Sequence, residues 1–227
     1  MKGIAAITAL LLLQHLSAFA GETKTVSTAD GTYAVKESAA YSKKLPDKAL
    51  TLAGITLGRQ SLFDVRGKLG MVEEKTANGA ISLCYESDNA SDKTAVVFRA
   101  PDMISGVTSF TIYNDRGNIP AAQACAKSRY IHKQIATGDG LNLGTEQKTI
   151  IAKLGKPTVE QRDRLVYVFS FKEAMTDDEM RLIEKAFQGR NADTHPEGYY
   201  WHRMTTIEIF LQNAEVTQIT VMKSGEA

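Results

Sequence analysis

Short helical stripes that alternate with strand-like runs organise the chain after residue 50. Apolar side chains recur at helical spacing at Leu62, Val65 and Leu69. Ser61 and Asp64 are typical of a capping box at the start of such a helix, and Gly70 is typical of its end. Runs of apolar residues between turn signals then predict strands over 81–86, 94–99 and 106–113.

The same order returns about 85 residues later. Segment 143–155 echoes segment 57–70, since both begin with Leu-Gly and end with Lys-Leu-Gly. Thr145 is the expected N-cap of the second helix, Gly155 its expected end, and strands are predicted over 165–171, 204–212 and 215–222. Such a period indicates one supersecondary unit used twice. We therefore expect an α+β fold of two tandem units, each a short helix packed on an antiparallel sheet of three to four strands.

The second unit carries an insertion, 172–203, between its first and second strands. The insertion opens with Thr176-Asp177-Asp178-Glu179, which is typical of a helix start, and an apolar stripe follows at Met180, Ile183 and Phe187. A helix is predicted over 176–188. After the leader we expect a loosely ordered segment at 21–49, with one short strand near 32–36. The first unit is expected at 50–137 and the second at 138–227.

The first twenty residues have the pattern of a secretory signal peptide. Lys2 precedes an apolar run over 4–13, and Ala18-Phe19-Ala20 forms an A-x-A cleavage site. We expect cleavage after Ala20 and a periplasmic or secreted protein. The run is shorter than the roughly 20 residues that a membrane span needs, and no other stretch approaches that length, so no span is predicted in the mature chain.

The charge of the chain is balanced. It has 27 Lys and Arg and 26 Asp and Glu, and removal of the leader takes away Lys2 and no acid. A neutral chain without a sustained basic stripe does not attract a phosphate backbone at long range. Nucleic acid is therefore not an expected partner.

Cys84 and Cys125 are the two cysteines of the chain. An even number of cysteines in an oxidising compartment favours pairing, so we predict a disulfide between them. The alternative is a nucleophilic cysteine with His132 as its base. No family signature surrounds either cysteine, which disfavours that alternative.

The insertion also holds candidate groups for catalysis or metal binding. His195 and His202, with Asp193 and Glu197, could serve an exported hydrolase whose site lies in 172–203, or could gather around a metal ion. None has a spacing such as H-E-x-x-H, and the nucleophile-elbow, P-loop and dinucleotide-binding motifs are absent from the sequence. We expect a protein that is not an enzyme and has no metal or cofactor, with the hydrolase as the alternative.

An aromatic run ends the insertion at Tyr199, Tyr200, Trp201 and His202. Trp and Tyr carry much of the binding energy when they lie at a protein interface. Successive residues of a strand point to opposite faces, so the four side chains cannot all be buried on one side. The run is either a partner-binding patch or the packing surface of the inserted helix, and the sequence leaves both interpretations open.

The helix that ends in Lys153-Leu154-Gly155-Lys156-Pro157-Thr158, followed by antiparallel strands, resembles units of the β-lactamase inhibitory protein family and of the BamE-like (SmpA/OmlA-like) assembly lipoproteins. The resemblance spans nearly all of the chain after Leu50. It implies non-catalytic units that offer a sheet face or edge loops to another envelope or extracellular protein. This chain has no lipobox cysteine, and its two cysteines cannot supply one disulfide per unit as in the inhibitor.

Overall fold

The computed structural model describes residues 23–28, 31–36, 41–119, 124–187 and 200–226. Its fold is α+β, with mostly antiparallel strands. The α-helices of this described part are α1 (Leu62–Leu69), α2 (Gln147–Leu154) and α3 (Asp177–Phe187). Its strands are β1 (Thr23–Thr28), β2 (Gly31–Lys36), β3 (Thr51–Leu52), β4 (Ile55–Thr56), β5 (Lys75–Ala77), β6 (Ala80–Ser87), β7 (Ala95–Ala100), β8 (Ser109–Tyr113), β9 (Ala126–Ser128), β10 (Val159–Gln161), β11 (Arg164–Ala174), β12 (Tyr200–Gln212) and β13 (Glu215–Glu226).

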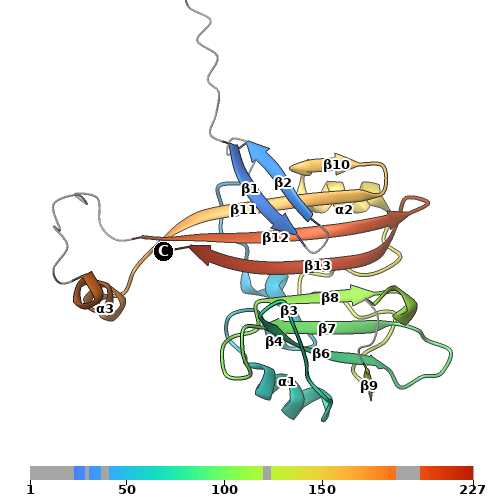
Figure 1. Ribbon diagram of the computed structural model, residues 1–227. Coiled ribbons are helices and arrows are strands. Elements are labelled where there is room, and N and C mark those ends of the chain that lie inside the picture. The colour runs from blue at the N-terminus through green and yellow to red at the C-terminus, as the bar shows by residue number, and fades with distance from the viewer. Residues whose placement is uncertain (1–22, 29–30, 37–40, 120–123, 188–199, 227) are drawn as a thin grey trace, which may run out of the picture.

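One nine-stranded sheet runs through the whole molecule (Figure 1). Its strand order is β10-β11-β12-β13-β8-β7-β6-β5, and β9 pairs with β6 in the parallel direction. The N-terminal and C-terminal halves of the chain meet where β8 pairs with β13, over Ser109–Tyr113 and Gln218–Met222. The two halves therefore share one continuous sheet.

Helix α1 forms where its local sequence predicts. The Ser61 amide donates to Asp64 Oδ2 at 2.7 Å, and the Ser61 hydroxyl oxygen accepts from the Asp64 amide, which completes a capping box. Hydrogen bonds from Ser61 lower the pKa of the Asp64 carboxyl. The helix ends at Gly70, whose φ of 112° favours glycine. Both boundaries are thus set by residues in or next to the helix.

The prediction that Thr145 is the N-cap of α2 is wrong. Glu146 is the N-cap and makes no capping hydrogen bond with its side chain. The Thr145 hydroxyl, expected at the cap, instead donates to Asn142 Oδ1 at 2.7 Å. A competing partner three residues earlier therefore takes the hydroxyl away from the helix.

The segments that lead into α1 and α2 are anchored to the sheet in the same way. The Gly58 amide donates to the Val107 carbonyl and the Gly144 amide to the Val216 carbonyl, both at 2.8 Å. Gly58 and Gly144 have φ values of 78° and 74°, which a residue with a side chain adopts only with strain. Each valine amide donates back to the same segment, at 2.8 and 3.0 Å. Each helix start is thus fixed beside one of the two strands that meet at the centre.

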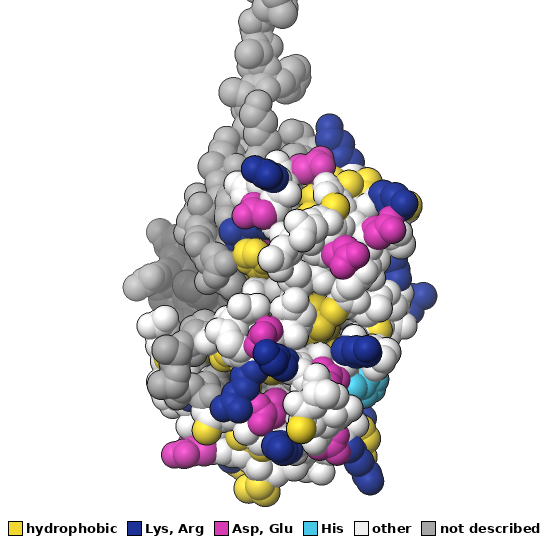
Figure 2. All heavy atoms as spheres, turned by 90° about the vertical axis from the view of Figure 1, so that its right-hand side faces the viewer, with side chains coloured by type: hydrophobic (Ala, Val, Ile, Leu, Met, Phe, Trp, Pro, Cys, Tyr) yellow, Lys and Arg dark blue, Asp and Glu magenta, His cyan; other side chains and the backbone are white. Residues whose placement is uncertain are grey.

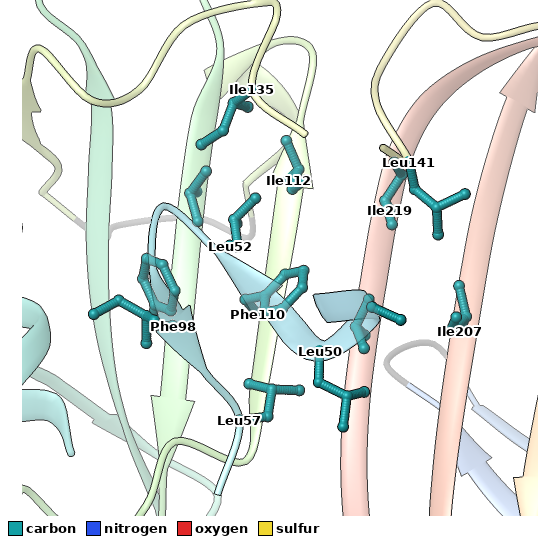
Figure 3. Close-up of a cluster of buried hydrophobic side chains, with 14 of the residues drawn as sticks. Leu50, Leu52, Leu57, Phe98, Phe110, Ile112, Ile135, Leu141, Ile207 and Ile219 are labelled. Atoms are coloured by element: carbon teal, nitrogen blue, oxygen red, sulfur yellow. The ribbon is translucent and has the colours of Figure 1, made fainter. Parts of the chain in front are cut away.

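The main hydrophobic core lies on one face of the sheet and belongs to both halves. Figure 3 shows Leu50, Leu52 and Leu57, on and beside the β3–β4 hairpin, between core side chains of β7 and β8 and those of β12 and β13. These three leucines are at most 4% exposed. Because the same side chains contact both halves, neither half can keep this core if the other leaves.

No linker separates the predicted units at residues 137 and 138, within the described chain. The Gly138 amide donates to the Thr51 carbonyl at 2.9 Å, and Leu52 forms an isolated bridge with Thr137. A side chain at position 138 would bring its Cβ within 2.8 Å of the Lys48 carbonyl oxygen. Glycine is needed here because two backbones meet at the centre of the molecule.

The predicted disulfide is confirmed. Cys84 on β6 is bonded to Cys125, which immediately precedes β9, with 4.5 Å between their Cα atoms. It packs with Val97 and Tyr113 on the face of the sheet opposite the main core. Both sulfurs are oxidised, so the alternative of a cysteine nucleophile paired with His132 is wrong.

The N-terminal segment contributes a separate β1–β2 hairpin. The sequence predicted one strand near 32–36, which β2 matches, and gave no indication of β1. Figure 1 places the hairpin in front of β11 and β12. No helix in the described ranges is long and apolar enough to cross a membrane.

Loss of the disulfide should destabilise the fold. The bond joins residues 41 positions apart. Closure of such a loop lowers the entropy of the unfolded chain and so raises its free energy by about 4 kcal/mol. We expect the double variant Cys84→Ala/Cys125→Ser to unfold in urea with a free energy lower by about 3 kcal/mol. Reductant should lower the wild-type value similarly and leave the variant unchanged. Equal stabilities of wild type and variant would contradict this expectation.

Candidate functional site

Three strands extend beyond the rest of the sheet and carry α3 away from it (Figure 1). β11, β12 and β13 have 11, 13 and 12 residues, whereas β8, which continues the sheet from β13, has five. We call residues 171–187 and 200–203 the arm. The arm contains the described part of the segment in which the sequence placed its candidate residues.

The first turn of α3 is capped and bound to β12. The Thr176 amide and hydroxyl each donate to Glu179 Oε2 at 2.8 Å. The indole N–H of Trp201 donates to Glu179 Oε1 at 3.0 Å. Hydrogen bonds, the one from the Thr176 amide first, lower the pKa of Glu179. One carboxylate therefore starts the helix and joins it to the strand.

The aromatic run divides between the two faces of β12. Tyr199 lies outside the described residues. Trp201 and His202 are half-buried, whereas Tyr200 is 49% exposed. Alternation along the strand places Trp201 on one face, and Tyr200 and His202 on the other. Trp201 therefore contacts the inserted helix, and Tyr200 presents its ring to solvent.

A cluster of charged and aromatic side chains lies at the base of the arm. Glu173 accepts hydrogen bonds from Lys44 Nζ at 2.8 Å and from Arg203 Nε at 3.1 Å. The Arg203 guanidinium lies 4.8 Å from the centre of the Trp201 ring, and Lys44 Nζ lies 5.4 Å from that of Phe171. The hydrogen bond from Lys44 is the largest influence that lowers the pKa of Glu173, and burial opposes it.

Lys223 adds a third cation next to this cluster. Its residue pairs with Thr205 across β12 and β13, and its amide donates to the Thr108 carbonyl at 2.8 Å. Its Nζ lies 2.9 Å from where a Cβ on Gly58 would be. Burial is the main cause that lowers the pKa of Lys223, and the charge of Arg203 adds to it.

Of the four residues on which the hydrolase interpretation depends, His202 alone lies in the part of the chain that the structure describes. Asp193, His195 and Glu197 lie outside the described residues. Within the described ranges, no group of three or more His, Cys, Asp or Glu side chains could hold a metal ion.

A polar cleft of about 700 Å³ lies away from the arm and was not predicted. Three loops line it, with Asp92, Lys93, Asn114, His132 and Lys133 among its residues. Asp92 accepts from the amides of Thr94 and Lys133 at 2.9 and 2.7 Å. Burial raises the pKa of Asp92, but hydrogen bonds to its carboxylate outweigh burial and lower it overall. Because the loops are far apart in sequence, no local pattern marks the cleft.

A buried ion pair on the sheet face opposite the main core was also missed. Arg164 on β11 contacts Glu208 on β12, and these residues are 8% and 1% exposed. The Arg164 guanidinium also lies 4.8 Å from the centre of the Phe210 ring. The two residues are 44 positions apart in the sequence, so only the strand register brings them together.

Figure 2 shows the side of the molecule from which the β6–β7 and β12–β13 turns project. Lys and Arg side chains are interspersed with Asp and Glu across this face. Interspersed charges of both signs do not form the single-sign surface that favours a phosphate backbone. This face therefore adds nothing in favour of a nucleic-acid partner.

The neighbours of Lys223 should control its titration. Because Arg203 lowers and Glu173 raises the pKa of Lys223, Arg203→Gln should raise it and Glu173→Gln should lower it further. The measurement is a pH titration of reductively ¹³C-methylated protein by NMR, with the resonance assigned through Lys223→Arg. A Lys223 resonance that titrates with the same pKa in all three proteins would contradict the arrangement.

No protein-family model, curated protein or solved structure matches this chain. The resemblance to the β-lactamase inhibitory protein family and BamE-like units finds no support in these comparisons. What the chain does must therefore be inferred from its own residues.

Proposed function

We propose that the chain is an exported, non-catalytic module that binds another protein of the cell envelope or the extracellular space through its arm. It is built from two tandem units, 50–137 and 138–227, with α3 inserted in the second. The signal-peptide pattern and the disulfide favour export to the periplasm or out of the cell.

Equivalent positions in the two halves support the tandem design. β5 and β6 form a hairpin before β7 and β8, and β10 and β11 form one before β12 and β13. Their register makes Tyr85 and Phe169 equivalent. The Tyr85 hydroxyl donates to the Gly70 carbonyl, just after α1, at 2.9 Å. Phe169 has no hydroxyl, but Tyr41 stacks on its ring and donates to the Lys156 carbonyl, just after α2, at 2.7 Å. In each half a tyrosine hydroxyl thus contacts a carbonyl within two residues after the helix, although the two tyrosines come from different places in the chain.

The exposure of apolar side chains on the arm is the observation that carries the binding proposal. Leu182 on α3 is 68% exposed and lies off the predicted stripe of Met180, Ile183 and Phe187. Tyr200 on the arm is 49% exposed. A helix of 11 residues is marginal alone, so α3 needs its attachment at Trp201. Leu182 and Tyr200 thus lie exposed on an arm that extends from the sheet, where a partner protein can contact them.

Site-specific cross-linking in the envelope tests this proposal. A photoreactive amino acid at position 182 should give adducts with a second protein, and the same group at the exposed position 148 on α2 should not. Leu182→Ser, which leaves the described hydrogen bonds intact, should reduce capture of that protein by about tenfold, the loss expected at an apolar contact of moderate strength.

Two results would contradict the proposal. Equal adduct yields from positions 182 and 148 would show that the arm has no special role. Adducts of twice the mass of the chain, with a concentration-dependent mass in solution, would show self-association instead. Retention of the native circular dichroism spectrum by Leu182→Ser is the control for folding.

A further inference from the structure

We propose that Lys223, with Arg203 and Lys44, forms a binding site for an oxyanion at the base of the arm. The ligand group is a carboxylate or a phosphate. Arg203 belongs to the arm, but the site does not include Leu182 or Tyr200, on which the proposed protein binding rests.

The carboxylates around Lys223 are each engaged by other donors. Glu173 accepts from both Lys44 and Arg203. Asp47 is paired with Arg59. Within the described chain, no acceptor lies at hydrogen-bond distance from Lys223 Nζ. Lys44 and Arg203 therefore share the carboxylate of Glu173, and Lys223 has no carboxylate of the described residues at hydrogen-bond distance.

An ammonium group in this position is costly without an anion. Burial removes water from a charged amine, and cations nearby oppose its protonation. The lowered pKa of Lys223 has burial as its largest cause, with Arg203 and Lys44 adding to the shift and Glu173 and Asp47 opposing it. A bound anion would offset both the burial and the repulsion, so the site has free energy to gain from such a ligand.

The Lys223 side chain packs against a glycine of the segment that leads into α1. Gly58 faces Lys223 Nζ, and Gly225 pairs with Arg203 across β12 and β13. The close approach of Nζ to Gly58 means that a larger residue there would push the ammonium aside. The position of the Lys223 ammonium thus depends on glycine at position 58.

The donor types define the class of ligand. A guanidinium presents parallel N–H groups that match two oxygens of a carboxylate or phosphate, and an ammonium adds a point charge with three donors. The two sources are a free phosphate group and a carboxylate carried on a peptide. Both groups present negatively charged oxygens to the same cations.

Titration calorimetry with two probes tests the proposal. Inorganic phosphate and acetylated tetraglutamate amide are titrated into the full mature chain, with chloride holding the ionic strength constant to remove general screening. We expect at least one probe to bind with a dissociation constant in the millimolar range or tighter. Lys223→Gln should weaken binding by about tenfold, and Lys223→Arg should largely retain it.

Lys172→Gln is the matched control, because Lys172 is exposed on the opposite face of β11. It should change binding by less than about twofold. Binding of phosphate alone identifies a phosphate site, and binding of the peptide alone identifies a carboxylate site. Binding of neither probe, or equal losses in Lys172→Gln and Lys223→Gln, overturns the proposal. If Lys223→Gln does not fold, the fallback is NMR of the ¹³C-methylated protein that keeps Lys223. Its Lys223 resonance should shift when the probe is added, and the absence of a shift overturns the proposal.

Discussion

The antiparallel pairing of β8 with β13 is the constraint on which the rest of the structure depends. It joins five residue pairs, from Ser109 with Met222 to Tyr113 with Gln218. A hydrogen bond between the hydroxyls of Thr111 and Thr220, 3.1 Å long and buried, lies at its centre. Without this pairing each half would expose a sheet edge and lose its share of the core around the β3–β4 hairpin.

The two ends of this pairing are built alike and carry different chemistry. At one end the Asn114 amide donates to the Thr217 carbonyl, and at the other the Lys223 amide donates to the Thr108 carbonyl. Asn114 lines the polar cleft, and Lys223 lies beside the charged cluster of the arm. One backbone arrangement thus supports a neutral amide at one end of the pairing and a cation at the other.

Local sequence was enough for features that depend on neighbouring residues, and for little else. The capping box of Ser61 with Asp64 and the glycine at 70 were predicted because both act within one helix. The disulfide followed from cysteine number and expected compartment. The N-cap of α2 was predicted wrongly because Asn142 competes for Thr145. The contact of Arg164 with Glu208 and the surroundings of Lys223 had no local signal, since they form only when distant strands pair.

Native-state hydrogen exchange in increasing urea tests most directly whether β8 and β13 make the halves one cooperative unit. The amides to compare are those of Phe98 on β7 and Ile209 on β12, which lie on either side of the pairing. We expect both amides to exchange through the same opening, with equal free energies of opening and equal dependence of those free energies on urea. If one half opens at a lower free energy, with about half the urea dependence of the other, the halves open independently and the β8–β13 pairing does not make them one cooperative unit.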